Sequence, residues 1–293
     1  MTTSDSHAMA DPFDSERARL QGLAYRMLGS VADAEDVVQE AWLRWEGLGA
    51  QGRADVQRPA AWLTTVTSRL ALDKLKSAQH QREEYVGPWL PEPVLTDGDP
   101  ALAAELAESL TIGFLAVLER LAPIERAVFL LADVFAEPYS AIAPVVERSE
   151  EACRQIASRA RRHVREERQL FQPAAARRDD LLNAFLAACA FGQVDDLRRV
   201  LGDDVVLVSD GGRDFHAARR PVVGFDRVSR LLLNIATRLP ADSTVAHHEV
   251  NGEPGLVFTR GDRTTMVMVF EVHSNRIEAI RLVINPEKLS RIG

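Results

Sequence analysis

Apolar residues recur at helical spacing through the first part of the chain. In the stretch DAEDVVQEAWLRW they fall three or four residues apart, which predicts an amphipathic helix, at Val37, Val38, Ala41, Trp42 and Trp45. Asp33 precedes this run and is a candidate N-cap. The stretch RPAAWLTTVTSRLALDKLKSA predicts a second helix that begins at Pro59, with an apolar face made by Trp62, Val66, Leu70 and Leu75.

The helical pattern breaks in YVGPWLPEPVLTDGDP, where proline and glycine punctuate the sequence. This composition is typical of a solvated linker, yet it holds Trp89 and Leu90, which are large apolar residues that need a surface to pack against. Helical spacing then resumes at Ala101 and continues to about Gln172, interrupted by Pro123, Pro138 and Pro144. We therefore expect several short helices there.

The final part of the chain changes from helical spacing to strand spacing. RRDDLLNAFLAACAFGQVDDLRRVL predicts helices, and DVVLVSD, GLVFTR, TTMVMVFEV and IEAIRLVIN predict short strands rich in β-branched residues. Turn pairs such as Asn251-Gly252 and Gly261-Asp262 lie between strands. Helices followed by hairpin-connected strands predict an α+β domain.

The stretch PYSAIAPVVERSEEACRQIASRARRHVREE predicts two short helices joined by a tight turn. Ser149 can cap the second helix, with Glu150 and Glu151 in its first turn. Small apolar residues line one face of that helix, and the other face carries Arg154, Gln155, Ser158, Arg159, Arg161, Arg162 and Arg165. Arginine on such a face can contact phosphates or guanine, so the pattern favours a DNA-binding helix-turn-helix over the solvated face of a bundle helix.

Composition limits the remaining function classes. The chain has 293 residues, a net charge of −8 and a pI of about 5.5, which leaves nucleic-acid binding to local patches. It has no run long enough to span a bilayer and no basic-then-apolar leader at its start. The two cysteines, Cys153 and Cys189, lie far apart, so we expect a cytoplasmic protein without disulfide, metal or cofactor.

Together these motifs resemble the bacterial extracytoplasmic-function (ECF) sigma factors. LAYRMLGSVADAEDVVQEAWLRW and RPAAWLTTVTSRLALDKLKSA resemble sigma region 2, and the helix-turn-helix resembles region 4, in the family's order and spacing. The resemblance implies two all-α sigma domains, a region 2 helical bundle and a region 4 helix-turn-helix. It divides the chain into a disordered N-terminus at 1–12, region 2 at 13–84, a linker at 85–100, region 4 at 101–172 and a further domain at 177–293.

The resemblance also assigns functions to particular residues. It implies that core RNA polymerase, through its largest-subunit clamp and its flap, is a partner, with the clamp contacted by Glu35, Asp36, Gln39 and Glu40. It implies a promoter −10 element contacted by Ser68, Arg69, Asp73, Lys74 and Lys76. It implies a −35 element contacted from the second helix of the motif by Arg154, Gln155, Ser158, Arg159 and Arg162. Without the family, the acidic set would be an ordinary solvated helix face.

The C-terminal residues resemble SnoaL-like domains of the NTF2 fold, an α+β cone around an apolar cavity, which the SigJ-like subgroup of ECF sigma factors carries. The subgroup's marks are a WLPEP linker, a DGGG-like loop and an NPDKL-like end. They appear here as Trp89, Leu90, Pro91, Glu92 and Pro93, as Asp210, Gly211, Gly212 and Arg213, and as Asn285, Pro286, Glu287, Lys288 and Leu289. Arg213 and Glu287 depart from the subgroup pattern.

We expect the WLPEP linker to dock near the Asp210 loop and to regulate the sigma regions in cis. Prolines 91 and 93 favour an extended backbone, Trp89 offers apolar area, and Gly211 and Gly212 allow close backbone approach. The alternative is a local clasp inside the sigma core with no regulatory role.

Two other function classes stay open. NTF2-like domains also include cyclases and isomerases, and candidate acid or base groups here are Asp210, Asp214, His216, His247 and His248. All three tyrosines precede the domain, and the adjacent histidines would face opposite sides of a strand, so we expect no catalytic residues and no enzyme. A small ligand in the cavity is a further candidate partner. The other class is a helix-turn-helix regulator with a sensor domain, which would usually dimerise, whereas a free sigma factor is expected to be a monomer.

Overall fold

The computed structural model describes residues 11–83, 85, 87–97, 111–168, 178–212, 215 and 217–292. These form two compact units, one of residues 1–77 and 123–158 and the other of residues 78–122 and 159–293. Each unit is described by itself. Most of the N-terminus predicted to be disordered, and the start predicted for region 4 at residue 101, lie outside the described residues.

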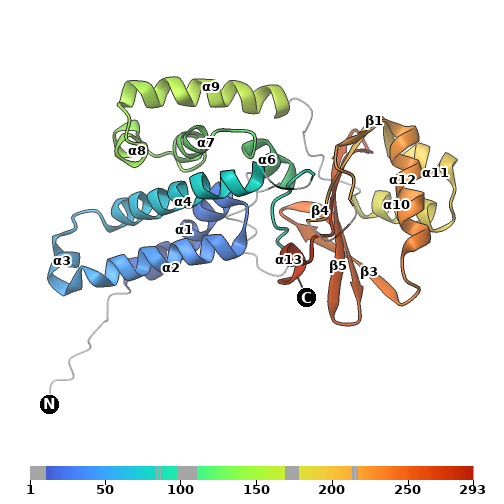
Figure 1. The fold of residues 1–293 in the computed structure, drawn as a ribbon, viewed down its shortest axis with the longest axis horizontal. Helices are drawn as coiled ribbons and strands as arrows, with labels where there is room; N and C mark the ends of the chain where they lie inside the picture. The colour runs from blue at the N-terminus through green and yellow to red at the C-terminus, as the bar shows by residue number, and fades with distance from the viewer. Residues whose placement is uncertain are drawn as a thin grey trace, which may run out of the picture. The chain divides into compact units, whose positions relative to one another are not determined.

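The first described part of the first unit is a series of helices, and the first two are capped by short polar side chains. The helices are α1 (Pro12–Leu28), α2 (Val31–Gly47), α3 (Gly49–Asp55) and α4 (Pro59–Glu83) (Figure 1). The carboxylate of Asp11 accepts hydrogen bonds from the Phe13 amide at 2.8 Å and from the Trp45 indole at 3.1 Å. The N-cap predicted at Asp33 is wrong, because Ser30 caps α2 and accepts a hydrogen bond from the Asp33 amide at 3.3 Å.

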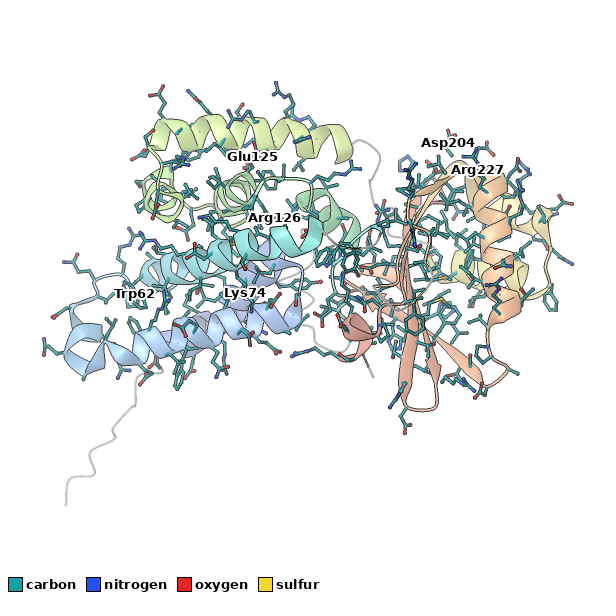
Figure 2. The ribbon with its side chains drawn as sticks, viewed as in Figure 1. Trp62, Lys74, Glu125, Arg126, Asp204 and Arg227 are labelled. Atoms are coloured by element: carbon teal, nitrogen blue, oxygen red, sulfur yellow. The ribbon has the colours of Figure 1, made fainter. Side chains whose placement is uncertain are left out.

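The core between these helices uses part of the predicted apolar faces. Val37, Val38, Ala41 and Trp45 are buried, and the ring of Trp45 lies 5.5 Å from that of Trp62. Figure 2 labels Trp62 on α4. Trp42 is 40% exposed because it lies one step around α2 from that stripe. On α4 the buried face is centred on Leu63, Thr67, Ala71 and Leu75, whereas Val66 and Leu70 are only partly buried.

The rest of this unit holds the predicted helix-turn-helix. Its elements are α7 (Pro123–Phe129), the π-helical turn η1 (Leu130–Val134), α8 (Tyr139–Val146) and α9 (Glu150–Arg168), which continues beyond the unit. Ser149 caps α9 as predicted and accepts from the Ala152 amide at 3.2 Å. Arg126 of α7 is buried and donates to the carbonyl oxygen of Met27, near the end of α1, at 2.8 Å (Figure 2).

The second unit is built around a six-stranded sheet with the order β2-β1-β6-β5-β4-β3. Its strands are β1 (Leu201–Asp210), β2 (Val222–Val223), β3 (Ser243–Val250), β4 (Glu253–Arg260), β5 (Arg263–His273) and β6 (Arg276–Val283). Strands β1 and β6 are parallel, and the other neighbours are antiparallel. The remaining elements are α6 (Ile112–Leu118), α10 (Arg178–Ala190), α11 (Val194–Val200), α12 (Phe225–Arg238) and α13 (Pro286–Leu289).

Apolar side chains alternate between the two sides of the strands, so both faces of the sheet are apolar. The helices α10, α11 and α12 lie on one side of the sheet, the helix face (Figure 1). On this face, side chains such as Leu207, Met268 and Phe270 form a core with side chains of these helices. On the opposite linker face, Val257, Val267, Val269 and Val283 pack with Leu90 of the linker, Ile112 of α6 and Leu289 of α13. Successive residues of a strand point to opposite faces, so each central strand contributes to both cores. The predicted fold class, helical parts followed by an α+β domain, is confirmed.

Candidate functional site

The outer face of α9 is a continuous polar and basic surface. Ile156, Ala157, Ala160 and Val164 are buried on the other face, and the exposed residues are Arg154, Gln155, Ser158, Arg159, Arg161, Arg162 and Arg165. Arg154 forms an ion pair with Glu150 at 2.8 Å and lies over the Tyr139 ring of α8 at 5.4 Å. The short helix α8, the left-handed turn residue Glu147 and the capped α9 give the geometry of a helix-turn-helix.

The residues of α4 predicted to contact the −10 element lie in three different environments. Ser68 is fully buried, so it has no access to a DNA strand in this conformation. Arg69 is exposed and donates to the carbonyl oxygen of Pro144 in α8 at 2.9 Å. Asp73 and Lys76 are exposed and lie 3.7 Å apart.

Lys74 links the two surfaces that were predicted separately. Its ammonium lies 2.8 Å from Asp33 and 2.9 Å from Asp36 of α2 (Figure 2). Burial by itself would lower the pKa of Lys74, but the hydrogen bonds from its ammonium to these two carboxylates outweigh it and raise that pKa. One predicted DNA contact is therefore paired with Asp36, a predicted polymerase contact.

The predicted polymerase surface on α2 borders a groove. The groove has a volume of about 460 Å³ and is lined by Arg17, Gln21, Glu35, Val38, Gln39 and Trp42. Glu35, Asp36 and Gln39 are exposed, and Glu40 forms an ion pair with Arg44 at 3.0 Å. A half-exposed tryptophan beside acidic and amide groups is suited to an interface, in which an aromatic anchor lies within a polar surround. Sequence analysis missed Trp42 here because its helical spacing placed it with the core.

In the second unit, Asp210 is the centre of a hydrogen-bond cluster that holds the linker. Its side chain is fully buried at the end of β1. One carboxylate oxygen accepts from the Leu90 amide at 2.8 Å and from the Lys288 ammonium at 2.7 Å. The other accepts from the Tyr85 hydroxyl and from the Gly212 amide, the latter at 3.1 Å. The charge of Asp210 is thus matched by donors from the linker, its own loop and α13.

Lys288 connects this cluster to the aromatic residues of the linker. It donates to the carbonyl oxygen of Leu90, and its ammonium lies 3.8 Å from the ring centroid of Trp89 and 5.5 Å from that of Tyr85. Burial, followed by the hydrogen bond to Asp210, raises the pKa of Tyr85 well above its ordinary value, so its hydroxyl stays protonated as a donor.

The linker residues differ in what they contribute. Leu90 is fully buried and is the main apolar anchor, whereas Trp89, the anchor expected from the sequence, is only partly buried and acts through Lys288. Pro91, Glu92 and Pro93 are also buried. Sequence analysis did not assign Tyr85 to the site, although its place at the start of the linker was a signal.

The glycines of the Asp210 loop serve the domain rather than the linker. A side chain on Gly211 would lie 2.6 Å from the Phe215 carbonyl oxygen. Gly212 has a φ of +66°, and a side chain there would lie 2.9 Å from the Asn285 side chain. The closest approach at both glycines is therefore to residues of the domain itself. Asn285 in turn donates to the Tyr85 hydroxyl at 3.1 Å, while Pro286 begins α13.

A second set of contacts holds the linker at the β3–β4 turn. The Val94 amide donates to the side-chain oxygen of Asn251 at 2.9 Å, and the Asn251 amide donates to the Val94 carbonyl oxygen at 2.8 Å. The Thr96 amide donates to the Glu249 carbonyl oxygen at 2.8 Å, and Leu95 pairs with Val250 as in an antiparallel strand. Linker contacts thus occur from Tyr85 to Asp97, beyond the five-residue motif on both sides.

The helix face has a core of apolar side chains from α10, α11, α12 and the strands. Asp210 lies on the linker face, and His248 of β3 pairs with the linker residue Asp97 at 2.8 Å, next to His247. Asp214 and His216, the other candidates, lie outside the described residues, as does Arg213.

Comparison with known proteins finds two family models along the chain. Residues 13–81 match Sigma-70 region 2, and residues 113–164 match Sigma-70, region 4. The ECF RNA polymerase sigma factor SigJ of Mycobacterium tuberculosis is 39% identical over 297 residues, which cover 95% of this chain and 92% of that protein. A protein named "Probable ECF RNA polymerase sigma factor SigI" from the same organism is 34% identical over 278 residues, covering 94% of this chain and 92% of the relative.

The likeness extends to a solved structure. The crystal structure of the Mycobacterium tuberculosis extracytoplasmic function sigma factor SigJ aligns with a TM-score of 0.76 and 37% identity, covering 95% of this chain and 97% of that chain. Among the described residues, no helix is both long and apolar enough to cross a membrane. The family resemblance predicted from the sequence is confirmed.

Proposed function

The chain belongs to the ECF sigma factors, and from this premise we propose that α2 binds core RNA polymerase, α4 contacts the −10 element, α9 reads the −35 element, and the C-terminal α+β domain regulates these activities in cis. As a member of this family the chain is a non-enzymatic initiation factor that directs RNA polymerase to promoters. The finer assignments rest on the geometry of the individual surfaces.

The exposed basic face of α9 is the observation that carries the DNA-binding proposal. Gln155, Ser158, Arg159 and Arg162 all point away from the buried stripe of that helix. A capped helix of this kind can enter the major groove, where arginine and glutamine side chains distinguish base edges. The net charge of −8 does not oppose this, because the positive charge is local to one face.

The α2 groove supports the polymerase-binding proposal. Glu35 and Gln39 line it together with the partly exposed ring of Trp42. Attraction between this acidic surface and a basic helical partner would speed their association and fix their relative orientation. The aromatic ring would supply apolar contact.

Contacts within the first unit support a closed, promoter-incompetent state of the free chain. Arg69 of region 2 donates to Pro144 of the helix-turn-helix at 2.9 Å, and buried Arg126 of region 4 donates to Met27 of region 2 at 2.8 Å. The −10 and −35 elements are centred about 25 base pairs apart, roughly 85 Å of duplex at 3.4 Å per base pair. Helices that touch directly cannot occupy both elements at once, so these contacts must break on the promoter.

The docked linker supports regulation in cis. The chain that joins the two sigma regions is fixed to the C-terminal domain at the Asp210 cluster and again at Asn251. A linker held in this way restricts the separation of the regions that it connects, so docking favours the closed state and release favours the open one. Binding of polymerase and promoter would then shift the population toward release.

Reconstituted transcription tests the proposal. The purified chain is mixed with core RNA polymerase from an actinobacterium and genomic DNA, and RNA 5′ ends are mapped. We expect new start sites that share two upstream elements, and we expect them to disappear with an Arg159→Ala variant. Absence of sigma-dependent start sites, in spite of stable binding to core polymerase, would refute promoter recognition.

A further inference from the structure

The helix α6 belongs to region 4 by sequence and to the C-terminal domain by packing. The region 4 family match begins at residue 113, inside α6, yet α6 falls in the same compact unit as the sheet. Ile112 and Ala116 pack into the apolar cluster of the linker face, beside Val267 and Val269. Leu90 of the WLPEP motif packs in the same cluster, so α6 and the linker share one apolar surface of the sheet.

Gly113 is the point of closest approach between α6 and the sheet. A Cβ atom at this position would lie 2.1 Å from a carboxylate oxygen of Glu271 and 3.5 Å from a guanidinium nitrogen of Arg281. No real side chain tolerates the first of these distances, so the absence of a side chain at Gly113 is what allows α6 to lie on the strands. Helix geometry does not need glycine here, because no positive φ occurs at this position.

The residues under Gly113 form a buried ion pair beside the apolar cluster of the linker face. Glu271 of β5 and Arg281 of β6 lie 2.6 Å apart, with side chains 6% and 8% exposed. The second carboxylate oxygen of Glu271 is buried and accepts no hydrogen bond within the described part of the chain. Covering these charges with α6 carries a desolvation cost that valine side chains would not impose.

This arrangement points to a contact that is built to be released. The apolar cluster favours docking of α6, and the buried pair opposes it, which leaves a small net free energy that polymerase or promoter binding can overcome. A wholly apolar face would hold the helix more tightly, as in an ordinary domain core.

Building on the proposed function, we propose that the linker face of the C-terminal sheet is a docking surface for α6, the helix in which the region 4 match begins, and that Gly113 over the Glu271–Arg281 pair sets its strength. The C-terminal domain thereby controls region 4 directly, through a contact that shares its apolar cluster with Leu90 but has its own point of approach at Gly113. Release of α6 accompanies opening of the sigma factor.

Hydrogen exchange in the full-length chain tests the contact without relying on transcription. We expect Gly113→Ala to increase the exchange rate of the α6 amides about tenfold or more, because the added methyl group displaces the helix from Glu271. The matched control is Gly47→Ala at the end of α2, where nothing lies within 4 Å of the added atom. Alanine has a higher helix propensity than glycine, so we expect the amides of α2 in this control variant to exchange at an unchanged or slower rate.

A charge-replacement variant tests the role of the pair. Glu271→Met combined with Arg281→Met removes both charges while keeping bulky side chains, so we expect slower exchange in α6 and several-fold less transcription. Gly113→Ala is expected to raise transcription several-fold. Unchanged α6 exchange in Gly113→Ala, or faster α6 exchange in the double variant, would overturn the inference.

The two proposals fail in different ways. If Trp89→Ala raises transcription while Gly113→Ala leaves α6 exchange unchanged, regulation in cis stands and the α6 contact is refuted. If the wild-type chain directs no transcription with core polymerase, the proposed function fails whatever the exchange data show.

Discussion

At the scale of single residues, Asp210 and Lys288 form the buried ion pair to which the backbone of the linker is hydrogen-bonded at Leu90. Both are nearly inaccessible to solvent, at 0% and 11% side-chain exposure, and 2.7 Å separates their charged atoms. Removing one partner of such a pair leaves the other charge buried without compensation, which costs more than the pair itself contributes.

We therefore predict that Lys288→Met lowers the free energy of unfolding by about 3 kcal/mol, measured by urea denaturation. The matched control is Lys76→Met, which removes an exposed lysine paired with Asp73 at 3.7 Å and should change stability by about 0.5 kcal/mol or less. Equal losses in the two variants would show that the Asp210 cluster is not an anchoring point.

The pH dependence of stability reports on Glu271. Burial raises the pKa of its carboxyl group, and the neighbouring Arg281 only partly offsets this. The folded state then binds more protons than the unfolded state, so this group's contribution to stability is present below the ordinary glutamate pKa of about 4.3 and is lost as the pH rises through the raised value.

Glu271→Gln removes that titration. Relative to wild type, we expect this variant to gain stability steadily as the pH is raised from about 4.5 to 7.5 in a urea-unfolding series. A stability difference that stays constant across this range would contradict a raised pKa at Glu271.

Residue-level prediction from the sequence was uneven for physical reasons. Asp210, Leu90 and Lys288 were identified through the motifs of the resembling subgroup, and all three meet in one cluster. Tyr85 and Asn251 were missed because their partners are remote in sequence, and nothing local marks a tyrosine hydroxyl or a turn amide as a linker contact. Trp89 was predicted to be the apolar anchor in place of Leu90, because ring size alone does not indicate which of two adjacent apolar residues points inward.

At the scale of elements, α2 offers a matched pair of variants. Trp42 lines the groove and is 40% exposed, whereas Leu43 is 50% exposed and is not part of the groove lining. We predict that Trp42→Ala weakens binding to core RNA polymerase about 30-fold, the effect of a buried aromatic anchor, and that Leu43→Ala has little effect. Equal affinities for the two variants, measured by fluorescence titration, would place the interface elsewhere.

The recognition helix gives a second prediction at this scale. Arg159→Ala in α9 should weaken binding of the holoenzyme to its −35 element by about 1–3 kcal/mol and relax base preference there. The control is Arg199→Ala in α11, a 79% exposed arginine outside the sigma regions. Loss of affinity without any change in base preference would indicate that Arg159 contacts a DNA phosphate rather than a base.

Element prediction succeeded where a local signal decides the structure. Ser149 caps α9 and Pro59 begins α4, because capping and proline effects depend on neighbours in sequence. The buried face of α4 differs from the predicted one, because its buried residues Thr67 and Ser68 are polar and were not counted as core. Packing against the neighbouring helices, rather than the hydrophobic pattern of α4, therefore determines which of its faces is buried.

At the scale of the whole molecule, the grouping of elements could not be read from the sequence. The chain order predicts α6 with the helix-turn-helix, whereas its packing unites it with a sheet that is formed by residues more than eighty positions later. Such pairing depends on one glycine fitting over one buried carboxylate, and no periodicity reveals it.

The most direct test concerns opening of the first unit. Spin labels are placed on exposed positions of α3 in region 2 and of the helix-turn-helix in region 4, at Gln51 and Arg148, and their separation is measured by pulsed electron resonance. We predict a short, narrow distance distribution in the free chain and a shift to a longer distance in the complex with core polymerase and promoter DNA. A distribution that stays unchanged in a complex that initiates transcription would contradict a closed free state.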